Sequence, residues 1–199
     1  MIITIGRQFG SGGREIGEKL AKRLGYAFYD KEILTMAAEE SGFSAAAMQH
    51  YDEKPTGSLI YGLYMTGAAT SDTLPLNQQL AFAQFNVIRK VAQADNCVIL
   101  GRCADYILRE KNNVLSVFLH APLEFRAKRI MAEKNIDSQA LAEKTVKRTD
   151  KARADYYNFF THKKWGDAEA TMLSFDTSAL GIDTVVDILA GTVELMLEK

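Results

Sequence analysis

Short runs of apolar, often β-branched residues alternate along the chain with longer stretches in which apolar residues recur at helical spacing. The runs at 1–5, 97–100 and 114–119 each contain one polar residue at most, which is typical of strands buried on both faces of a sheet. Two shorter runs, at 27–29 and 173–175, also predict strands.

Helices are predicted between these strands. After the first strand, Ile16, Leu20 and Leu24 recur at helical spacing, and Gly25 provides a C-terminal stop. A long helix is predicted from Leu76, since apolar residues from there to Ala94 fall on one stripe. Further helices are expected after Asp30, which would cap the next one, from Ser44 to Gln49, around 105–110, from Pro122 to about Lys134, over 138–160 and over 183–197.

Buried strands that alternate with helices predict an α/β protein of three layers, in which about five parallel strands carry helices on both faces. The 199 residues suffice for one domain with a small appendage, without internal repeat or interdomain linker. Residues 42–75 fit the alternation least well, because they mix prolines and glycines with tyrosines over a stretch too long for a structureless loop. We expect an insertion with some helix there.

Charge and composition narrow the function classes. With 24 Lys and Arg against 25 Asp and Glu, the net charge of −1 argues against a nucleic-acid binder that works by bulk positive charge. The 47% of hydrophobic residues and 25% of charged residues are those of an ordinary globular protein, which excludes disordered and low-complexity classes.

The cysteines and histidines predict no metal site. Cys97 and Cys103 are too few for a disulfide framework or a four-cysteine zinc site, and we expect them to be reduced, buried thiols. The three histidines, His50, His120 and His162, lie far apart without ligand spacing.

The ends of the chain carry no predicted membrane or export signal. Residues 1–10 lack a basic start followed by a long apolar run, and the most apolar C-terminal stretch is interrupted by Asp187 and Glu194. We therefore expect a cytoplasmic protein with neither a membrane nor a nucleic acid as partner.

A glycine-rich loop between the first strand and the first helix is the first candidate site. Backbone N–H groups converge there and the helix dipole favours an anion. The segment 7–14 aligns with the P-loop pattern G-x-x-x-x-G-K-[ST], with Gly10, Ser11 and Gly12 in the turn. The loop predicts a phosphate site, and an ordinary strand-to-helix turn is the alternative.

Arg14 strengthens the phosphate interpretation. A cation in the first turn of a helix is electrostatically unfavourable unless an anion lies in the loop, where a guanidinium can hold a phosphate by two hydrogen bonds. Arg7 flanks the loop on its other side. Alternatively, Arg14 points into solvent or pairs with Glu15 or Glu18.

A second candidate is Arg102, which follows Gly101 directly after the strand 97–100. Ligands in open α/β sheets bind beyond the carboxyl ends of the strands, so an arginine there points toward the ligand crevice. A structural salt bridge, for instance to Asp105, is the alternative.

Basic residues after the strand 114–119 form the third candidate. Arg126 and Arg129 lie on one helical face, and Lys144, Arg148 and Lys151 form a stripe, with Lys147 and Arg153 nearby. A solvated face is the usual meaning of such a stripe. In a phosphoryl-transfer enzyme, however, a mobile basic segment can close over the phosphates. The aromatic residues that follow are interpreted as core or hinge packing, or else as base-stacking groups.

Four stretches together resemble the nucleoside monophosphate kinases, and most of all cytidylate kinase. They are ITIGRQFGSGGREIGEKLAKRLGY at 3–26 with FYD ending at Asp30, VILGR at 98–102, VFLHAPLEFRAKR at 117–129, and VKRTDKARADYY at 146–157 followed by SFDTSALGIDTVVDIL at 174–189. More specifically, GSGGREI with LGYAFYDKEIL is similar to the cytidylate kinase-like proteins.

The resemblance implies a P-loop kinase fold with a monophosphate-binding insertion near 42–75 and a lid near 134–165. ATP with Mg²⁺ would bind the glycine loop, and the residues assigned to it are Arg7, Gly10, Ser11, Gly12, Gly13, Arg14, Arg126 and Arg129. The acceptor nucleotide would face Asp30, Arg102, Asp105, Arg148 and Arg153. Of these, Arg14, Asp30 and Arg148 are the candidate catalytic residues.

The chain departs from true cytidylate kinases at three positions. Gly13 and Arg14 stand where those enzymes have Lys and Ser or Thr, and Cys103 stands where Asp follows Gly-Arg. We expect Arg14, with Arg7, to take over the role of the P-loop lysine. The double change Gly13→Lys with Arg14→Ser is expected to rebuild the standard motif.

The leading hypothesis is therefore transfer of the ATP γ-phosphoryl group to a nucleoside monophosphate, with CMP or dCMP favoured and Asp30 as the orienting carboxylate. Two alternatives stay open: a non-catalytic nucleotide-binding sensor or regulator, and a kinase for another small phosphorylated acceptor. Whether the protein is a monomer or a homodimer is left open.

Overall fold

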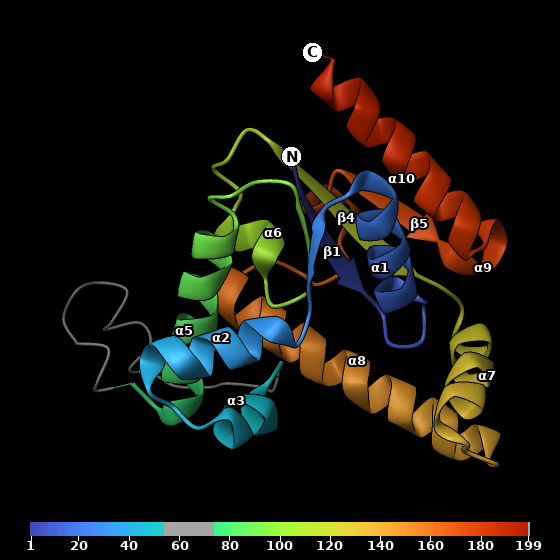
Figure 1. The fold of residues 1–199 in the computed structure, drawn as a ribbon. Coiled ribbons are helices and arrows are strands. Elements are labelled where there is room, and N and C mark those ends of the chain that lie inside the picture. Colours follow the sequence, from blue (N-terminus) through green and yellow to red (C-terminus); the bar gives the residue numbers. More distant parts are fainter. Residues whose placement is uncertain (54–73, 199) are drawn as a thin grey trace.

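The computed structural model describes residues 1–53 and 74–198, and within them the chain forms one five-stranded parallel sheet (Figure 1). The strands stand in the order β2-β3-β1-β4-β5. The predicted direction and approximate positions of the strands are confirmed. Their bounds are β1 Ile2–Arg7, β2 Ala27–Tyr29, β3 Cys97–Leu100, β4 Val114–His120 and β5 Leu173–Asp176.

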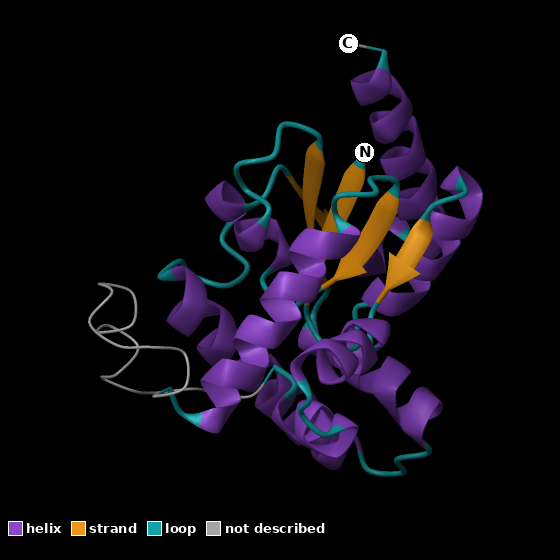
Figure 2. Cartoon of the chain, turned by 60° about the vertical axis from the view of Figure 1, so that its left-hand side comes forward, coloured by secondary structure: helices purple, strands orange, loops and turns teal. Residues whose placement is uncertain are grey.

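Helices lie on both sides of the sheet, as the alternating pattern predicts (Figure 2). The short α6 ends earlier than expected, and α9 and a 3₁₀ turn at Ala168–Ala170 were not foreseen from the sequence. The helix bounds are α1 Gly13–Leu24, α2 Glu32–Ser41, α3 Ala45–Tyr51, α5 Leu76–Val91, α6 Ala104–Ile107, α7 Leu123–Lys134, α8 Gln139–Thr161, α9 Thr177–Leu180 and α10 Ile182–Leu197.

Strand β1 lies at the centre of the sheet and sets the register of its neighbours. Ile2 pairs with Cys97 of β3 on one side and with Val114 of β4 on the other. Because all strands run parallel, their carboxyl ends meet at one edge of the sheet. The loops that follow β1 and β3 therefore lie side by side, at the place where ligands bind in open α/β folds.

Each face of the sheet has its own hydrophobic core. On one face, Ile3 and Ile5 pack with Ile16 of α1 and Leu189 of α10. On the other face, Ile2 packs with residues of α2, α3 and α5. The isoleucines of β1 thus enter opposite cores, which explains why the strand begins as an apolar run and confirms the predicted three layers.

The aromatic end of α8 forms a third, smaller core. Tyr156, Tyr157 and Phe160 are buried with Phe85 of α5 and with Cys103. Of the two interpretations that the sequence allowed for these aromatic residues, core packing is confirmed. This core attaches α8 to the body of the protein at its C-terminal end.

Asp30 does not cap α2, contrary to the expectation from the sequence. Lys31 occupies the N-cap position, and no side chain caps the helix there. The backbone N–H of Asp30 donates to Oε2 of Glu32 at 2.9 Å. The Asp30 carboxylate is consequently available for the site at the sheet edge.

Part of the predicted insertion is helical. Ser44 caps α3 by accepting a hydrogen bond from the backbone N–H of Ala47 at 3.1 Å, as the sequence suggested, and the helix runs two residues further than predicted. The expectations for 54–73 lie outside the described residues. Among the residues that are described, no helix is both long and apolar enough to cross a bilayer.

The two thiols give a prediction about reactivity. Cys97 and Cys103 are 1% and 4% exposed, and both are free. Burial raises the pKa of Cys97 to about 11 and raises that of Cys103 well above its ordinary value. Since the thiolate is the reactive form, the native protein should react with a thiol reagent at pH 8 orders of magnitude more slowly than the urea-unfolded chain. Fast labelling of either cysteine in the native protein would contradict this packing.

Candidate functional site

The glycine loop joins β1 to α1 and depends on glycine at two positions. Gly10 and Gly12 have φ of 82° and 81°, in the left-handed region that favours glycine. A Cβ on Gly10 would also lie 2.8 Å from the carbonyl oxygen of Arg126. The loop is therefore packed directly against α7 and cannot accept a side chain there.

Hydrogen bonds within the loop hold it closed. The hydroxyl and the backbone N–H of Ser11 both donate to the carbonyl of Gln8, at 2.9 and 3.3 Å. The Gln8 side chain in turn accepts from the N–H of Ala121 at 3.2 Å. The buried Ser11 hydroxyl thus serves the loop itself. No side chain caps α1, which leaves the N–H groups of its first turn to a ligand.

An open cleft of about 590 Å³, which includes space open to solvent, adjoins the loop. Its walls come from the loop, from the start of α1 and from α7 and α8. Of the predicted residues, those that line it are Arg7, Gly10, Gly12, Gly13, Arg14, Asp30, Arg129 and Arg153.

The stem of Arg7 occupies the space of the P-loop lysine. A Cβ on Gly13 would lie 2.8 Å from both Cβ and Cγ of Arg7. In the alignment with the P-loop pattern, Arg7 stands at the first glycine and Gly13 at the lysine. The cation and the glycine have exchanged places. The expectation that Gly13→Lys with Arg14→Ser rebuilds the motif stays a prediction, and the structure adds that the new side chain would collide with the Arg7 stem unless that stem shifts.

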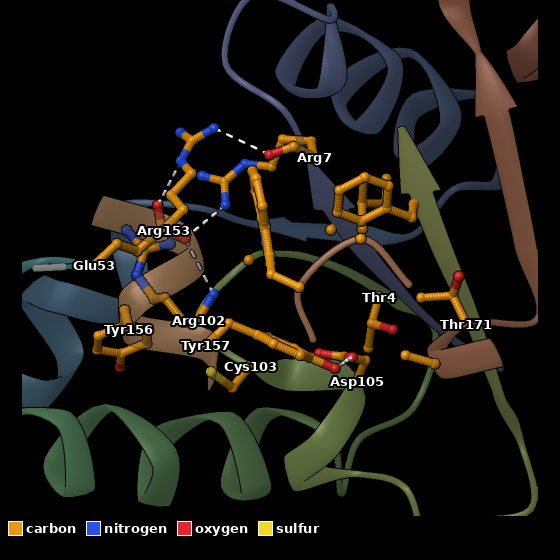
Figure 3. Close-up of a pocket in the computed structure, with 17 residues that line it drawn as sticks. Thr4, Arg7, Glu53, Arg102, Cys103, Asp105, Arg153, Tyr156, Tyr157 and Thr171 are labelled. Atoms are coloured by element: carbon orange, nitrogen blue, oxygen red, sulfur yellow. Dashed lines mark hydrogen bonds and ion pairs between the residues drawn. The ribbon is translucent and has the colours of Figure 1, made fainter. Parts of the chain in front are cut away.

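The guanidinium of Arg7 points away from the loop and binds Glu53, which lies just after α3. The Arg7 Nη1 to Glu53 Oε1 distance is 2.6 Å, and Nε of Arg153 is 3.0 Å from Oε2 of the same carboxylate (Figure 3). Burial alone would raise the pKa of Glu53. The attraction of Arg7 and Arg153 outweighs it and holds this pKa far below its usual range.

Arg102 is enclosed at the end of β3, and its side chain is 1% exposed. Its guanidinium donates to Asp30 at 3.3 Å, to Asp52 at 2.8 Å and to the Leu100 carbonyl at 3.1 Å. Burial raises the pKa of Asp52, and Arg102 opposes this shift. The sequence offered a salt bridge to Asp105 as one possibility for Arg102; the partners are Asp30 and Asp52 instead.

Arg14 lies at the rim of the cleft. Its Nε is 2.8 Å from Oε1 of Glu18, and its Nη1 is 3.6 Å from Oδ2 of Asp30. The Glu18 pair is the one that the sequence offered as an alternative to phosphate binding. With its side chain 56% exposed, Arg14 faces solvent and the cleft at once.

The two arginines of α7 have different surroundings. Arg126 is buried and joins three segments, since it donates to the carbonyls of Ala121 and Phe9 at 2.7 and 3.1 Å and pairs with Asp150 of α8 at 2.5 Å. Arg129 lines the cleft and pairs with Glu15 and Glu133. Arg126 therefore holds α7, the glycine loop and α8 together, whereas Arg129 is open to the cleft.

Arg148 and Asp105 lie apart from the loop cleft. Arg148 is exposed on α8, and within the described ranges it has neither an ion pair nor a hydrogen-bond partner for its side chain. Asp105 accepts a hydrogen bond from the Tyr157 hydroxyl at 2.7 Å, and burial raises its pKa. It faces a neighbouring cavity, on the side away from the Glu53 pairs (Figure 3).

Asp52 and Glu53 were not predicted as site residues from the sequence. They lie in the stretch whose pattern was least informative, immediately after the helix that Ser44 caps. The available signal was two consecutive acidic residues after a short predicted helix, in a chain with arginines at the expected sheet edge.

These features define a class. A parallel five-stranded sheet whose central strand leads through a glycine loop into a helix is the P-loop kinase fold. Shikimate kinases from Acinetobacter baumannii and Bacteroides thetaiotaomicron have this fold, with TM-scores of 0.51 and 0.56 at 15% identity. The matches cover 99% and 98% of this chain, and 92% and 98% of those chains.

Within that class, the chain belongs to the cytidylate kinase-like family, whose model matches residues 2–179. The resemblance found in the sequence is thereby confirmed. The family places the chain among phosphotransferases of the nucleoside monophosphate kinase type.

Three further proteins are similar to this chain, and two of them are cytidylate kinases. A cytidylate kinase from Methanocaldococcus jannaschii is 29% identical over 108 residues, which is 53% of this chain and 60% of that protein. A cytidylate kinase from Pyrococcus abyssi is 25% identical over 100% of this chain and 97% of that protein. The structure of an uncharacterized protein from Eubacterium ventriosum has a TM-score of 0.76 at 32% identity, with 98% of each chain covered.

The exchange between Arg7 and Gly13 gives a prediction about stability. Gly13→Lys alone should lower the free energy of unfolding by about 1–3 kcal/mol, as overpacking does. In the Arg7→Gly background the same change should cost less, because the stem that it meets is gone. Thermal or denaturant unfolding of the four proteins measures this coupling.

The matched control is Gly191→Lys, since Gly191 lies in a helix with no atom within 4 Å of an added Cβ. That change should be neutral or stabilising. A Gly13→Lys protein as stable as the parent, with no coupling to Arg7→Gly, would show that the cation and the glycine are independent.

Proposed function

We propose that this protein transfers the γ-phosphoryl group of ATP to a nucleoside monophosphate, with CMP or dCMP as the favoured acceptor. The observation that carries the proposal is the convergence of two anion-binding features at one sheet edge. The glycine loop with its uncapped helix follows β1, and the Arg102–Asp30 pair follows β3 and β2. Phosphoryl transfer depends mainly on such positioning and charge neutralisation.

The two nucleotides would occupy different walls of the cleft. The phosphates of ATP would lie on the N–H groups at the start of α1, near Arg129. The acceptor would lie near Arg102, Arg153 and the segment after α3. The adjacency of the β1 and β3 loops at the carboxyl edge supports this division.

Asp30 is the carboxylate placed to orient the acceptor. It is 6% exposed, and its two oxygens face Arg102 and Arg14. No general base is required in a loose phosphoryl-transfer transition state, so orientation is the role that remains. Arg14 would bind the phosphate that moves between the two nucleotides, and Arg148 would join the site when α8 closes on it.

The residues at the loop do not form a Mg²⁺ site by themselves. Arg14 stands at the position of the usual Ser or Thr ligand, and the Asp30 carboxylate is already turned toward two arginines. Residues 1–53 and 74–198 hold no group of three or more His, Cys, Asp or Glu arranged for a metal ion. We propose that Mg²⁺ enters on the phosphates of ATP.

One observation favours a second candidate, a nucleotide-binding regulator without turnover. The P-loop lysine is absent, and the stem of Arg7 fills its place while its guanidinium is held by Glu53. A kinase for another small phosphorylated acceptor would use the same arginines. In each case we place the protein in the cytoplasm, where its two free thiols would stay reduced.

Turnover decides between these functions. The protein is incubated with MgATP and a panel of nucleoside monophosphates and other phosphorylated acceptors, and ADP release is followed. We expect release above the ATPase background with CMP or dCMP. Arg148→Ala should lower kcat more than it weakens ATP binding, while its exposed neighbour variant Lys147→Ala should do neither. ATP binding by calorimetry without turnover on any acceptor would favour the regulator.

Arg14 gives a separate test of the phosphate site. Charge-assisted hydrogen bonds to a phosphate are worth about 1.5–3 kcal/mol, so Arg14→Ala should lower nucleotide affinity or turnover by about ten- to a hundredfold. Thermal stability should hardly change, because the Arg14–Glu18 pair is exposed. Arg14→Lys should recover only part of the loss, since an ammonium group cannot make the two parallel hydrogen bonds that a guanidinium makes to one phosphate.

Glu18→Gln is the control for this variant, because it breaks the ion pair and leaves the cation in place. If Arg14 acts on phosphate, Glu18→Gln retains affinity and turnover. Equal losses in the two variants would mean that Arg14 matters only through Glu18.

A further inference from the structure

The segment after α3 brings two carboxylates onto the arginines of the acceptor site. Oε1 of Glu53 accepts from Nη1 of Arg7 at 2.6 Å and from the backbone N–H of Arg102 at 3.3 Å. Oε2 accepts from Nε of Arg153 at 3.0 Å. Asp52 accepts from Nη2 of Arg102 at 2.8 Å. Donors from three separate segments thus converge on one pair of adjacent acids.

The charges balance in a specific way. Arg7, Arg102 and Arg153 face this point, and within residues 1–51 and 74–198 only Asp30 forms an ion pair with one of them. Without the segment after α3, these four residues would carry a net charge of two positive. Asp52 and Glu53 supply two negative charges. A phosphate monoester supplies about −1.5 to −2 at neutral pH, which is the same charge.

The backbone conformation of Glu53 indicates that surrounding contacts hold this residue in place. Glu53 has φ of 47°, in the left-handed region that non-glycine residues rarely adopt. On the opposite wall, a Cβ on Gly101 would collide with Arg7 Nη1 and with Oε1 of Glu53. The absence of a side chain at Gly101 creates the cradle in which the carboxylate sits.

We infer that Asp52 and Glu53 occupy the place of a phosphate monoester dianion and that this ligand displaces them when it binds. The inference deepens the proposed function, because it names the contacts that the acceptor must replace. The displacement concerns binding alone and does not depend on catalytic turnover. The same chemistry could come from the acceptor or from ATP. The position beside Arg102 and Arg153, rather than on the glycine loop, assigns it to the acceptor.

Binding to variants tests the displacement directly. Inorganic phosphate, CMP and ADP are titrated by calorimetry into the parent protein, Glu53→Gln and Asp52→Asn/Glu53→Gln. Removing the competing charge should raise the affinity for phosphate and CMP by about tenfold or more, while the affinity for ADP changes little. The unliganded variants should melt at a lower temperature, since buried arginines lose their counter-charge, and phosphate should raise their melting temperature more than that of the parent.

Glu194→Gln is the matched control, because Glu194 is exposed on α10. It should bind all three ligands as the parent does. Unchanged or weaker phosphate and CMP binding in a folded Glu53→Gln protein would overturn the inference. A higher affinity for ADP alone would overturn the assignment of this site to the acceptor. If the variants bind phosphate more tightly but the parent protein shows no turnover, the inference stands while the proposed kinase function fails.

Hydrogen exchange in the unaltered chain gives a measurement that no unstable variant can obscure. Saturating CMP or inorganic phosphate should speed exchange at the amides of Tyr51, Asp52 and Glu53, because their tether to the arginines is released. The N–H groups at the start of α1 should not respond to phosphate in the same way. Slower exchange at 51–53 would show that the ligand binds beside Glu53 instead of replacing it.

Discussion

The site depends on one buried ion pair, between Arg7 at the end of the central strand and Glu53 after α3. A guanidinium at the end of a fully buried strand needs a counter-charge, since leaving such a charge unpaired costs about 3–5 kcal/mol. Glu53 supplies it and binds Arg153 of α8 at the same time. One carboxylate therefore joins the sheet, the helical segment after β2 and the long helix α8.

The parallel register explains why these groups can meet. Arg7, Arg102 and Asp30 come from segments that end at the same edge, because β1, β3 and β2 are neighbours in the sheet. The apolar residues of β1 fix this register by entering two cores, one on each face. Packing of the strands thus determines which charged groups meet at the cleft.

Local signals were sufficient for the sheet, the glycine loop and the Gly101–Arg102 turn. Strand burial, glycine spacing and helix periodicity are all encoded within a few residues. The resemblance to a kinase family put Asp30 and Arg102 on the acceptor side, but their direct pairing was not predicted and appears only in the structure. Asp30 as a helix cap was wrong, because its carboxylate faces Arg102 and Arg14 instead of the first turn of α2.

The contacts that could not be predicted join residues far apart in the chain. Glu53 is 46 residues from Arg7 and 100 from Arg153, and nothing in the pattern of residues 42–75 indicates which way its side chain points. The position of the Arg7 stem over Gly13 is likewise a matter of three-dimensional packing. The sequence showed that a lysine is absent from the motif but not that its space is filled.

The packing of Arg7 over Gly13 also constrains how such a loop can change over generations. A descendant that first gains a lysine at position 13 carries two long side chains in the space of one. A descendant that first loses Arg7 carries no cation beside the loop from either position and leaves Glu53 with one guanidinium fewer. Both single substitutions are therefore unfavourable. A change from the Arg7 and Gly13 loop to the standard P-loop requires both substitutions together.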